Sequence, residues 1–289
     1  MNNILVSFLT PKKVELKGVW LGATQPHNLY ILVHGLGGSL FSRAALSMAL
    51  GKGKDAVLTF NNRGSGTINY FWTRKKGKTG SLLGGVAHEV FTDCLDDLDG
   101  VVAYARQRGA KNIFLLGHST GCQKSIYYLA KRPRSRVKGV ILLAPISDYS
   151  DVAAKLDQPD YRRALAAAER LKRMGRPQAL LPAGLWPTPL DAQRFLSLYT
   201  AKSQEEIFTY ASGRKPLTLQ AVKKPLFTVL AEADEFGDRP ALEIAAWFEK
   251  ILGKSRHNQI KIITGAIHSF VDCENKLAPM IRAWVKTLK

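Results

Sequence analysis

KNIFLLGHSTGCQKSIYY, residues 111–128, decides the fold of this chain, because it joins an apolar run to a second apolar pattern through a turn that contains a serine. The run that ends at Gly117 has the composition of a buried strand, and residues 122–129 have that of a helix. Gly117 and Gly121 flank Ser119 and lack side chains, so a strand and a helix can approach closely around the turn. The stretch therefore predicts a strand, a strained turn with Ser119 at its apex, and a helix.

The same five residues, GHSTG, also suit a tight strand-to-helix turn whose serine only caps the helix, so the rest of the chain has to decide. A chain of 289 residues, of which 46% are hydrophobic, is long enough for one large α/β domain or two small ones. Its three cysteines lack the spacing of zinc ligands, so we expect neither a metal site nor a disulfide framework. No apolar stretch reaches the length of a membrane span and no signal-peptide pattern opens the chain, so the sequence predicts a cytoplasmic protein.

The chain is strongly basic, with 42 lysine and arginine residues against 23 aspartate and glutamate residues and a net charge of +19. A solvated basic surface is the first interpretation of this charge, and steering of an anionic substrate or binding of nucleic acid are the alternatives. The basic runs lie in different parts of the chain and no aromatic residues are interleaved with them. We therefore expect no nucleic-acid partner.

Apolar runs with the composition of strands recur along the chain, and helical patterns separate most of them. The expected strands are residues 3–9, 14–23, 28–33, 56–60, 113–117, 137–143, 225–231 and 259–264. The expected helices are residues 41–50, 87–107, 122–129 and 241–252, and a last helix that ends near residue 288. This alternation predicts an α/β fold with a mostly parallel sheet, helices on both faces and an antiparallel hairpin at one margin. Residues 67–85 are polar, glycine-rich and basic, which predicts a long surface loop.

The alternation of strands and helices stops between residues 150 and 221. This segment carries a helical pattern interrupted by prolines, and it separates two parts of a core domain, residues 1–149 and 222–289. An insertion of this length between two strands predicts a helical lid over the carboxyl edge of the sheet, with extra core helices as the alternative. Its apolar side chains are candidates for the lining of a substrate pocket: Trp186, Phe195 and Tyr199.

Polar candidates for catalysis follow the expected strands, at the edge where the carboxyl ends of parallel strands meet. A serine hydroxyl is nearly inert at neutral pH, so it needs a base within hydrogen-bond reach, and that base needs an acid to orient it. Ser119, Asp234 and His268 occur in the chain order of the nucleophile-elbow architecture, each at a strand end. We therefore expect His268 to be the base and Asp234 the acid, with Asp148 as the alternative acid.

Hydrolysis of an acyl compound also needs hydrogen-bond donors where the carbonyl oxygen becomes negative. The amide of Thr120, at the positive end of the expected helix, is one candidate for this oxyanion hole. The amide of Leu36, in the glycine-rich turn HGLGG at residues 34–38, is the other. Glycine-rich turns also bind phosphates, but this turn matches neither GxGxxG nor GxxxxGK(S/T), so we expect no nucleotide cofactor.

These segments together resemble the α/β-hydrolase family, over nearly the whole length of the chain. The segments that carry the resemblance occur in the family's order: HGLGG at residues 34–38, NNRGSG at 61–66, GHSTG at 117–121, EADEF at 232–236 and IHSF at 267–270. The resemblance implies an eight-stranded sheet, a lid after the sixth strand, and hydrolysis of esters or related acyl compounds without a cofactor. GHSTGCQ and ADEF are also similar to a narrower group that includes fungal esterases of siderophores such as fusarinine C, although Lys124 stands where an acidic residue is expected.

The sequence thus predicts a serine esterase that acts on a small-molecule ester with an apolar or aromatic acyl group, through an acyl-enzyme intermediate. A thioesterase, an amidase or an acyltransferase would use the same three residues. A ligand-binding protein of the same fold with low turnover is the alternative from another functional class. The sequence predicts no particular oligomeric state, because any apolar interface is hidden among the apolar positions that build the core.

Overall fold

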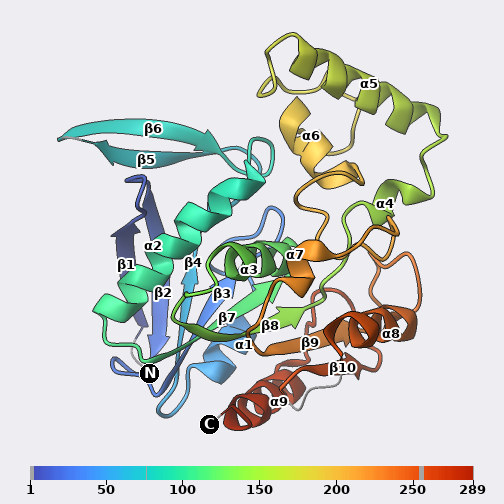
Figure 1. Ribbon diagram of the computed structural model, residues 1–289. Helices are drawn as coiled ribbons and strands as arrows, with labels where there is room; N and C mark the ends of the chain where they lie inside the picture. The colour runs from blue at the N-terminus through green and yellow to red at the C-terminus, as the bar shows by residue number, and fades with distance from the viewer. Residues whose placement is uncertain (1–2, 76, 254–256, 289) are drawn as a thin grey trace.

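Eight strands form one sheet in the computed structural model of the protein, which describes residues 3–75, 77–253 and 257–288 (Figure 1). In spatial order the strands are β1 (Asn3–Leu9), β2 (Glu15–Gly22), β4 (Ala56–Phe60), β3 (Asn28–Val33), β7 (Asn112–His118), β8 (Val137–Leu143), β9 (Leu226–Ala231) and β10 (Gln259–Ile263). Strand β2 runs antiparallel to both of its neighbours, and the remaining ladders are parallel. The prediction of a mostly parallel eight-stranded sheet with an antiparallel hairpin at its margin is confirmed.

Helices cover both faces of the sheet, as the sequence predicted (Figure 1). One face packs against α2 (Cys94–Gln107), α3 (Thr120–Lys131) and α8 (Ala241–Leu252), and the other against α1 (Ala44–Leu50) and α9 (Glu274–Lys286). Every residue of β3, β4 and β9 is buried, because apolar side chains on both sides of a central parallel strand need a cover. Among the described residues, no helix is long and apolar enough to cross a membrane.

The expected helix over residues 87–107 begins later than its apolar pattern indicated. Helix α2 starts at Cys94, after the single 3-10 turn η1 (Phe91–Asp93). Two backbone carbonyl groups before that turn accept hydrogen bonds from a distant segment. The amide of Asp191 donates to the carbonyl oxygen of Ala87, and the side chain of Gln193 donates to that of Glu89. Contacts with a distant segment therefore replace the first turns of the expected helix.

The prediction of a surface loop over residues 67–85 is wrong. Strands β5 (Asn69–Lys75) and β6 (Lys78–Gly84) form an antiparallel hairpin that projects above β1 and β2 at the upper left of Figure 1. Phe71 is buried against the core, whereas Tyr70 and Trp72 on either side of it are exposed. This alternation is that of a half-buried strand, and the lysines and glycines around it concealed the pattern in the sequence.

Residues 150–221 lie between β8, which is the sixth strand of the sheet in chain order, and β9. They form α4 (Ser150–Ala153), α5 (Pro159–Arg173), α6 (Ala192–Tyr199) and α7 (Leu217–Gln220). Helices α5 and α6 pack on each other around an apolar cluster of their own and lie beyond α3 at the upper right of Figure 1. The segment is thus helical and occupies the expected place in the chain. Its division from a core of residues 1–149 and 222–289, and its action as a lid, remain predictions.

Candidate active site

Ser119 lies at the turn between β7 and α3 in a backbone conformation that few residues other than glycine adopt, with φ 53° and ψ −129°. The neighbouring glycines leave the space for it. A Cβ atom on Gly117 would lie 2.6 Å from the carbonyl oxygen of Gly121, and one on Gly121 would lie 2.0 Å from that of Val33. Both approaches are closer than packed atoms tolerate, so the turn requires glycine at these two positions, and its geometry is the one that the sequence predicted.

His268 and Asp234 meet at the carboxyl ends of two neighbouring strands, β10 and β9. Nδ1 of His268 lies 2.9 Å from each carboxylate oxygen of Asp234, and both side chains are about nine-tenths buried. The amide of Phe236 donates to the same carboxylate at 3.0 Å, and its ring packs edge-on against the imidazole. A carboxylate that accepts the Nδ1 proton leaves Nε2 as the basic nitrogen of the ring.

The loop that carries His268 is also tied to the turn that carries Ser119. Nε2 of His118 donates to the carbonyl oxygen of His268 at 2.9 Å, and the two rings lie 5.1 Å apart. Burial lowers the pKa of His118 to about 3, so its ring is neutral at physiological pH. On the other side of the loop, the amide of His268 donates to Glu235 at 2.9 Å. His118, which precedes Ser119, thus holds the loop that carries His268. The sequence did not predict this contact.

Among the described residues, no hydrogen bond joins Ser119 to His268. In unliganded hydrolases this contact is often long, and it tightens when a substrate binds. Ser119 is partly accessible at the surface. The structure therefore brings His268 together with Asp234 and holds its loop beside the serine turn.

The glycine-rich turn at residues 34–38 lies directly against the serine. A Cβ atom on Gly35 would lie 2.7 Å from the Cβ atom of Ser119. Within the described part of the chain, neither the amide of Leu36 nor that of Thr120 has a hydrogen-bond acceptor. Two such free donors near a serine hydroxyl can stabilise negative charge on a carbonyl oxygen.

His34 shapes this turn from within. Its Nδ1 donates to the carbonyl oxygen of Gly35 at 2.9 Å, and its Nε2 accepts from the amide of Asn62 at 3.1 Å. Burial, with a smaller contribution from the charge of Lys124, lowers the pKa of His34 to about 4 and keeps the ring neutral. His34 therefore makes local backbone hydrogen bonds.

Asp148, the alternative acid, has a different partner. Its carboxylate accepts a hydrogen bond from the side chain of Gln123 at 2.7 Å, and no hydrogen bond joins it to His268 in the described residues. Burial raises the pKa of Asp148 well above its ordinary value, and the neighbouring Glu205 adds to this. Asp234, which contacts Nδ1 of His268 through both carboxylate oxygens, is therefore the acid that the geometry favours.

Behind the serine turn lies a chain of buried ion pairs that the sequence did not reveal. Lys124 on α3 lies 2.6 Å from Glu89, and Glu89 lies 2.9 Å from Arg194 on α6. Arg194 in turn lies 2.5 Å from Glu205. All four side chains are at least 96% buried. The network connects the helix that follows Ser119 to residues 150–221, and its one signal in the sequence was a lysine in place of the expected acidic residue.

The three aromatic residues proposed for a pocket lie together. Trp186 packs against Phe195 and Tyr199 with ring centroids 5.0 and 5.1 Å apart. Phe195 is fully buried in the cluster between α5 and α6, whereas Trp186 and Tyr199 are partly exposed. Contact of these side chains with a substrate stays a prediction, and for Phe195 it would require movement of the segment.

Comparisons with known proteins agree with this architecture. The chain is 27% identical to a putative esterase/lipase of Mycoplasma pneumoniae over 183 residues, which span 61% of the chain and 63% of that relative. A Pyrococcus furiosus esterase structure superposes with a TM-score of 0.58 and 16% identity, covering 99% of this chain and 91% of that one. The structure of the alpha/beta hydrolase GrgF from Penicillium superposes with a TM-score of 0.63 and 17% identity, covering 99% of each chain. At these identities the superpositions establish the fold.

A family profile described as "Protein of unknown function (DUF1749)" matches residues 77–287, which is more than two thirds of the chain. The matched part contains the serine turn, the acid and the histidine. The sheet topology and the superpositions confirm the expected fold. The chain belongs to the DUF1749 family, and its fold is that of the α/β-hydrolases.

Proposed function

We propose that this protein is a serine hydrolase that cleaves carboxylic esters of small molecules. The observation that carries the proposal is the strained backbone of Ser119, with φ 53°, at a turn held beside the His268–Asp234 pair. Strain of this kind costs about 1–3 kcal/mol and is retained where a side chain has to be presented to a ligand. A serine that only caps a helix needs no such conformation.

In the proposed reaction Ser119 Oγ attacks the carbonyl carbon of the ester while Nε2 of His268 takes its proton. Asp234 holds the ring through Nδ1 and stabilises the positive charge that forms on it. The amides of Leu36 and Thr120 donate to the oxygen that becomes negative, and each is worth about 3–4 kcal/mol in the transition state. His268 then returns the proton to the leaving alcohol, and a water molecule releases the acid from Ser119 by the same steps in reverse order.

Residues 150–221 would act as the lid of this site and select its substrates. The partly exposed aromatic side chains Trp186 and Tyr199 suit an apolar or aromatic acyl group. Siderophore esters are one class of substrate to include in a screen, because of the similarity of GHSTGCQ and ADEF to that group. Matched ester, thioester and amide acyl donors would separate an esterase from a thioesterase or an amidase, which share the same chemistry at the serine.

The deciding experiment is labelling with a fluorophosphonate probe followed by hydrolysis of p-nitrophenyl esters of increasing acyl length. We expect the wild-type protein to be labelled and to hydrolyse an ester. Ser119→Ala should lose the label and at least about 10³-fold of kcat/KM, because loss of the nucleophile removes the covalent route.

Ser81→Ala, which changes an exposed serine of the β5–β6 hairpin, is the matched control and should keep both properties. Hydrolysis that survives in Ser119→Ala would contradict the proposed mechanism. A folded wild-type protein that is neither labelled nor active, but that retains a bound ligand, would favour the low-turnover binding protein instead.

A further inference from the structure

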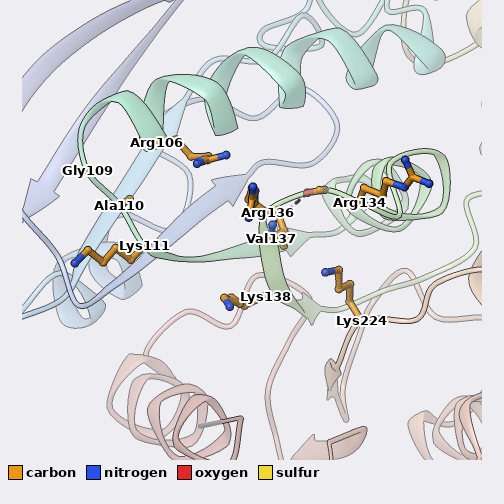
Figure 2. Close-up of a pocket in the computed structure, with 10 residues that line it drawn as sticks. Arg106, Gly109, Ala110, Lys111, Arg134, Arg136, Val137, Lys138 and Lys224 are labelled. Carbon is orange, nitrogen blue, oxygen red and sulfur yellow. Dashed lines mark hydrogen bonds between the residues drawn. The ribbon is translucent and has the colours of Figure 1, made fainter.

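A cavity of about 620 Å³ opens at the amino edge of the sheet, where β7, β8 and β9 begin (Figure 2). Six cationic side chains line it and come from four places in the chain: the end of α2, the loop before β7, the start of β8 with the residues just before it, and the residues before β9. We call it the basic cavity, and its cations are Arg106, Lys111, Arg134, Arg136, Lys138 and Lys224. In Figure 2, Lys111 and Arg134 lie at its two sides and the other four lie between them.

The six cations have no counter-charge within the described residues. None of them takes part in an ion pair, whereas the neighbouring Arg132 pairs with Asp99 at 2.9 Å. The remaining lining residues are Gly109, Ala110, Ser135 and Val137, so the cavity contains no carboxylate and no aromatic ring. A concave surface with one sign of charge concentrates ions of the opposite sign.

The basic cavity is separate from the proposed active site. Strand β7 runs from the cavity, which Lys111 lines, to the turn that holds Ser119. The eight residue steps from Lys111 to Ser119 correspond to about 25 Å along an extended strand. The cavity therefore lies at the opposite edge of the sheet from the serine, and its charges are not needed for ester hydrolysis.

The chemistry of the lining indicates which anion would fit. Guanidinium groups donate two parallel hydrogen bonds to one phosphate group, and lysine ammonium groups add compact positive charges. Six cations exceed what a single carboxylate or phosphate can neutralise, so the ligand has to carry several anionic groups. The absence of an aromatic ring in the lining leaves no platform on which a nucleobase could stack, so recognition would depend on the phosphates.

We propose that the basic cavity binds a soluble small molecule that carries several phosphate groups, independently of the hydrolytic site. A volume of about 620 Å³ has room for a ligand of this size. A soluble ligand is proposed over a phospholipid head group because the surface that carries the charges is concave.

Isothermal titration with inorganic tripolyphosphate, at 150 mM NaCl, tests the proposal directly. We expect one site per chain, and affinity that rises when the salt is lowered to 20 mM. The triple variant Arg106→Gln, Arg136→Gln, Lys138→Gln should bind at least about 10-fold more weakly, since each lost cation raises Kd. All three side chains are exposed, so the variant should keep the wild-type thermal midpoint.

A second triple variant removes the same kinds of charge elsewhere and serves as the control. Arg170→Gln, Lys172→Gln and Arg176→Gln also delete two arginines and one lysine from exposed positions, in or just after α5. This variant should bind tripolyphosphate within about threefold of the wild type, because the net charge of the two triple variants is equal. Equal losses in both variants, or no binding by the wild-type protein, would overturn the proposal.

Two further titrations identify the ligand class. Citrate, which carries three carboxylates, should bind at least about 10-fold more weakly than tripolyphosphate, and equal affinity would remove the preference for phosphate. Sedimentation with vesicles that contain phosphatidic acid distinguishes the source of the phosphate. Vesicle binding that tripolyphosphate displaces is consistent with the proposal, whereas binding that resists displacement and is lost in the first triple variant would assign the cavity to a membrane lipid.

Discussion

Ser119 keeps its strained backbone because several neighbours hold it in place. Its amide donates to Leu143 at 3.0 Å, and its carbonyl accepts from Cys122 at 2.8 Å. The glycine turn presses against its Cβ atom from the other side. These contacts balance a strain of about 1–3 kcal/mol.

We expect His118 to be a positioning residue, which holds the loop of His268 beside the serine turn. His118→Ala removes the donor to the carbonyl of His268, so the loop of the base loses its connection to the serine turn. For a protein with the proposed activity, we expect kcat to fall about 10-fold with KM nearly unchanged, which corresponds to about 1.4 kcal/mol in the transition state. Steady-state kinetics on the best p-nitrophenyl ester would measure both constants.

His118→Gln is the matched comparison, because its side-chain amide can donate to the same carbonyl. It should recover part of the lost kcat. If both variants lowered the thermal midpoint and left kcat unchanged, the contact would be structural only.

Helix α3 carries the positive charge of Lys124 on its buried face. The carboxylate that balances this charge, that of Glu89, lies outside the helix. Burial opposes ionisation of Glu89, but the charges of Lys124 and Arg194 outweigh this effect and lower its pKa. Lys124 and Arg194 thus share Glu89 and Glu205 as counter-charges. Buried pairs of this kind contribute little net stability, yet removal of one partner is costly.

Lys124→Met should therefore destabilise the protein by about 3–5 kcal/mol, because it leaves two buried carboxylates with one cation. Adding Glu89→Gln restores the balance between Arg194 and Glu205, so the double variant should be more stable than Lys124→Met alone. Urea unfolding followed by circular dichroism would give the three free energies. A double variant less stable than the single one would show that packing, and not charge balance, determines the cost.

The pH dependence of folding reflects buried groups from several parts of the molecule. Glu206 accepts hydrogen bonds from Ser147 at 2.8 and 3.0 Å, yet burial raises its pKa to about 7. In the unfolded chain the carboxyl group loses its proton near pH 4.5, so the folded state binds more protons between pH 4.5 and 7. Stability from this group is present at low pH and is lost as the pH rises through that window. The buried His34 and His118 act in the opposite direction, since their pKa values are lowered.

Glu206→Gln isolates this contribution, because glutamine is nearly isosteric and does not titrate. Relative to the wild type, the variant should gain stability between pH 5 and pH 8, by as much as about 3 kcal/mol. Urea unfolding of both proteins at several pH values measures the difference, in which the histidine contributions cancel. Glu249→Gln, at an exposed position on α8, is the control and should give a flat difference. A flat difference for Glu206→Gln would contradict the raised pKa.

The sequence by itself determined the features that depend on a few adjacent residues. The glycines around Ser119 fixed the strained turn, because only glycine tolerates the contacts that this turn imposes. The apolar runs fixed the strands of the sheet, and the parallel order then placed Asp234 and His268 at one edge. The β5–β6 hairpin escaped notice because lysines and glycines masked an alternation over only seven residues in each strand.

Only the tertiary structure decided which distant groups meet. In the folded chain His268 contacts Asp234, and Asp148 accepts a hydrogen bond from Gln123, although both acids follow strands. It also placed Lys124 between residues from other elements, and it assembled the basic cavity from loops that are far apart in the chain. Backbone strain and hydrophobic periodicity act over a few residues and can be read locally. Ion pairs and cavities depend instead on how side chains pack across the sheet, and burial makes their energies large only after the chain has folded.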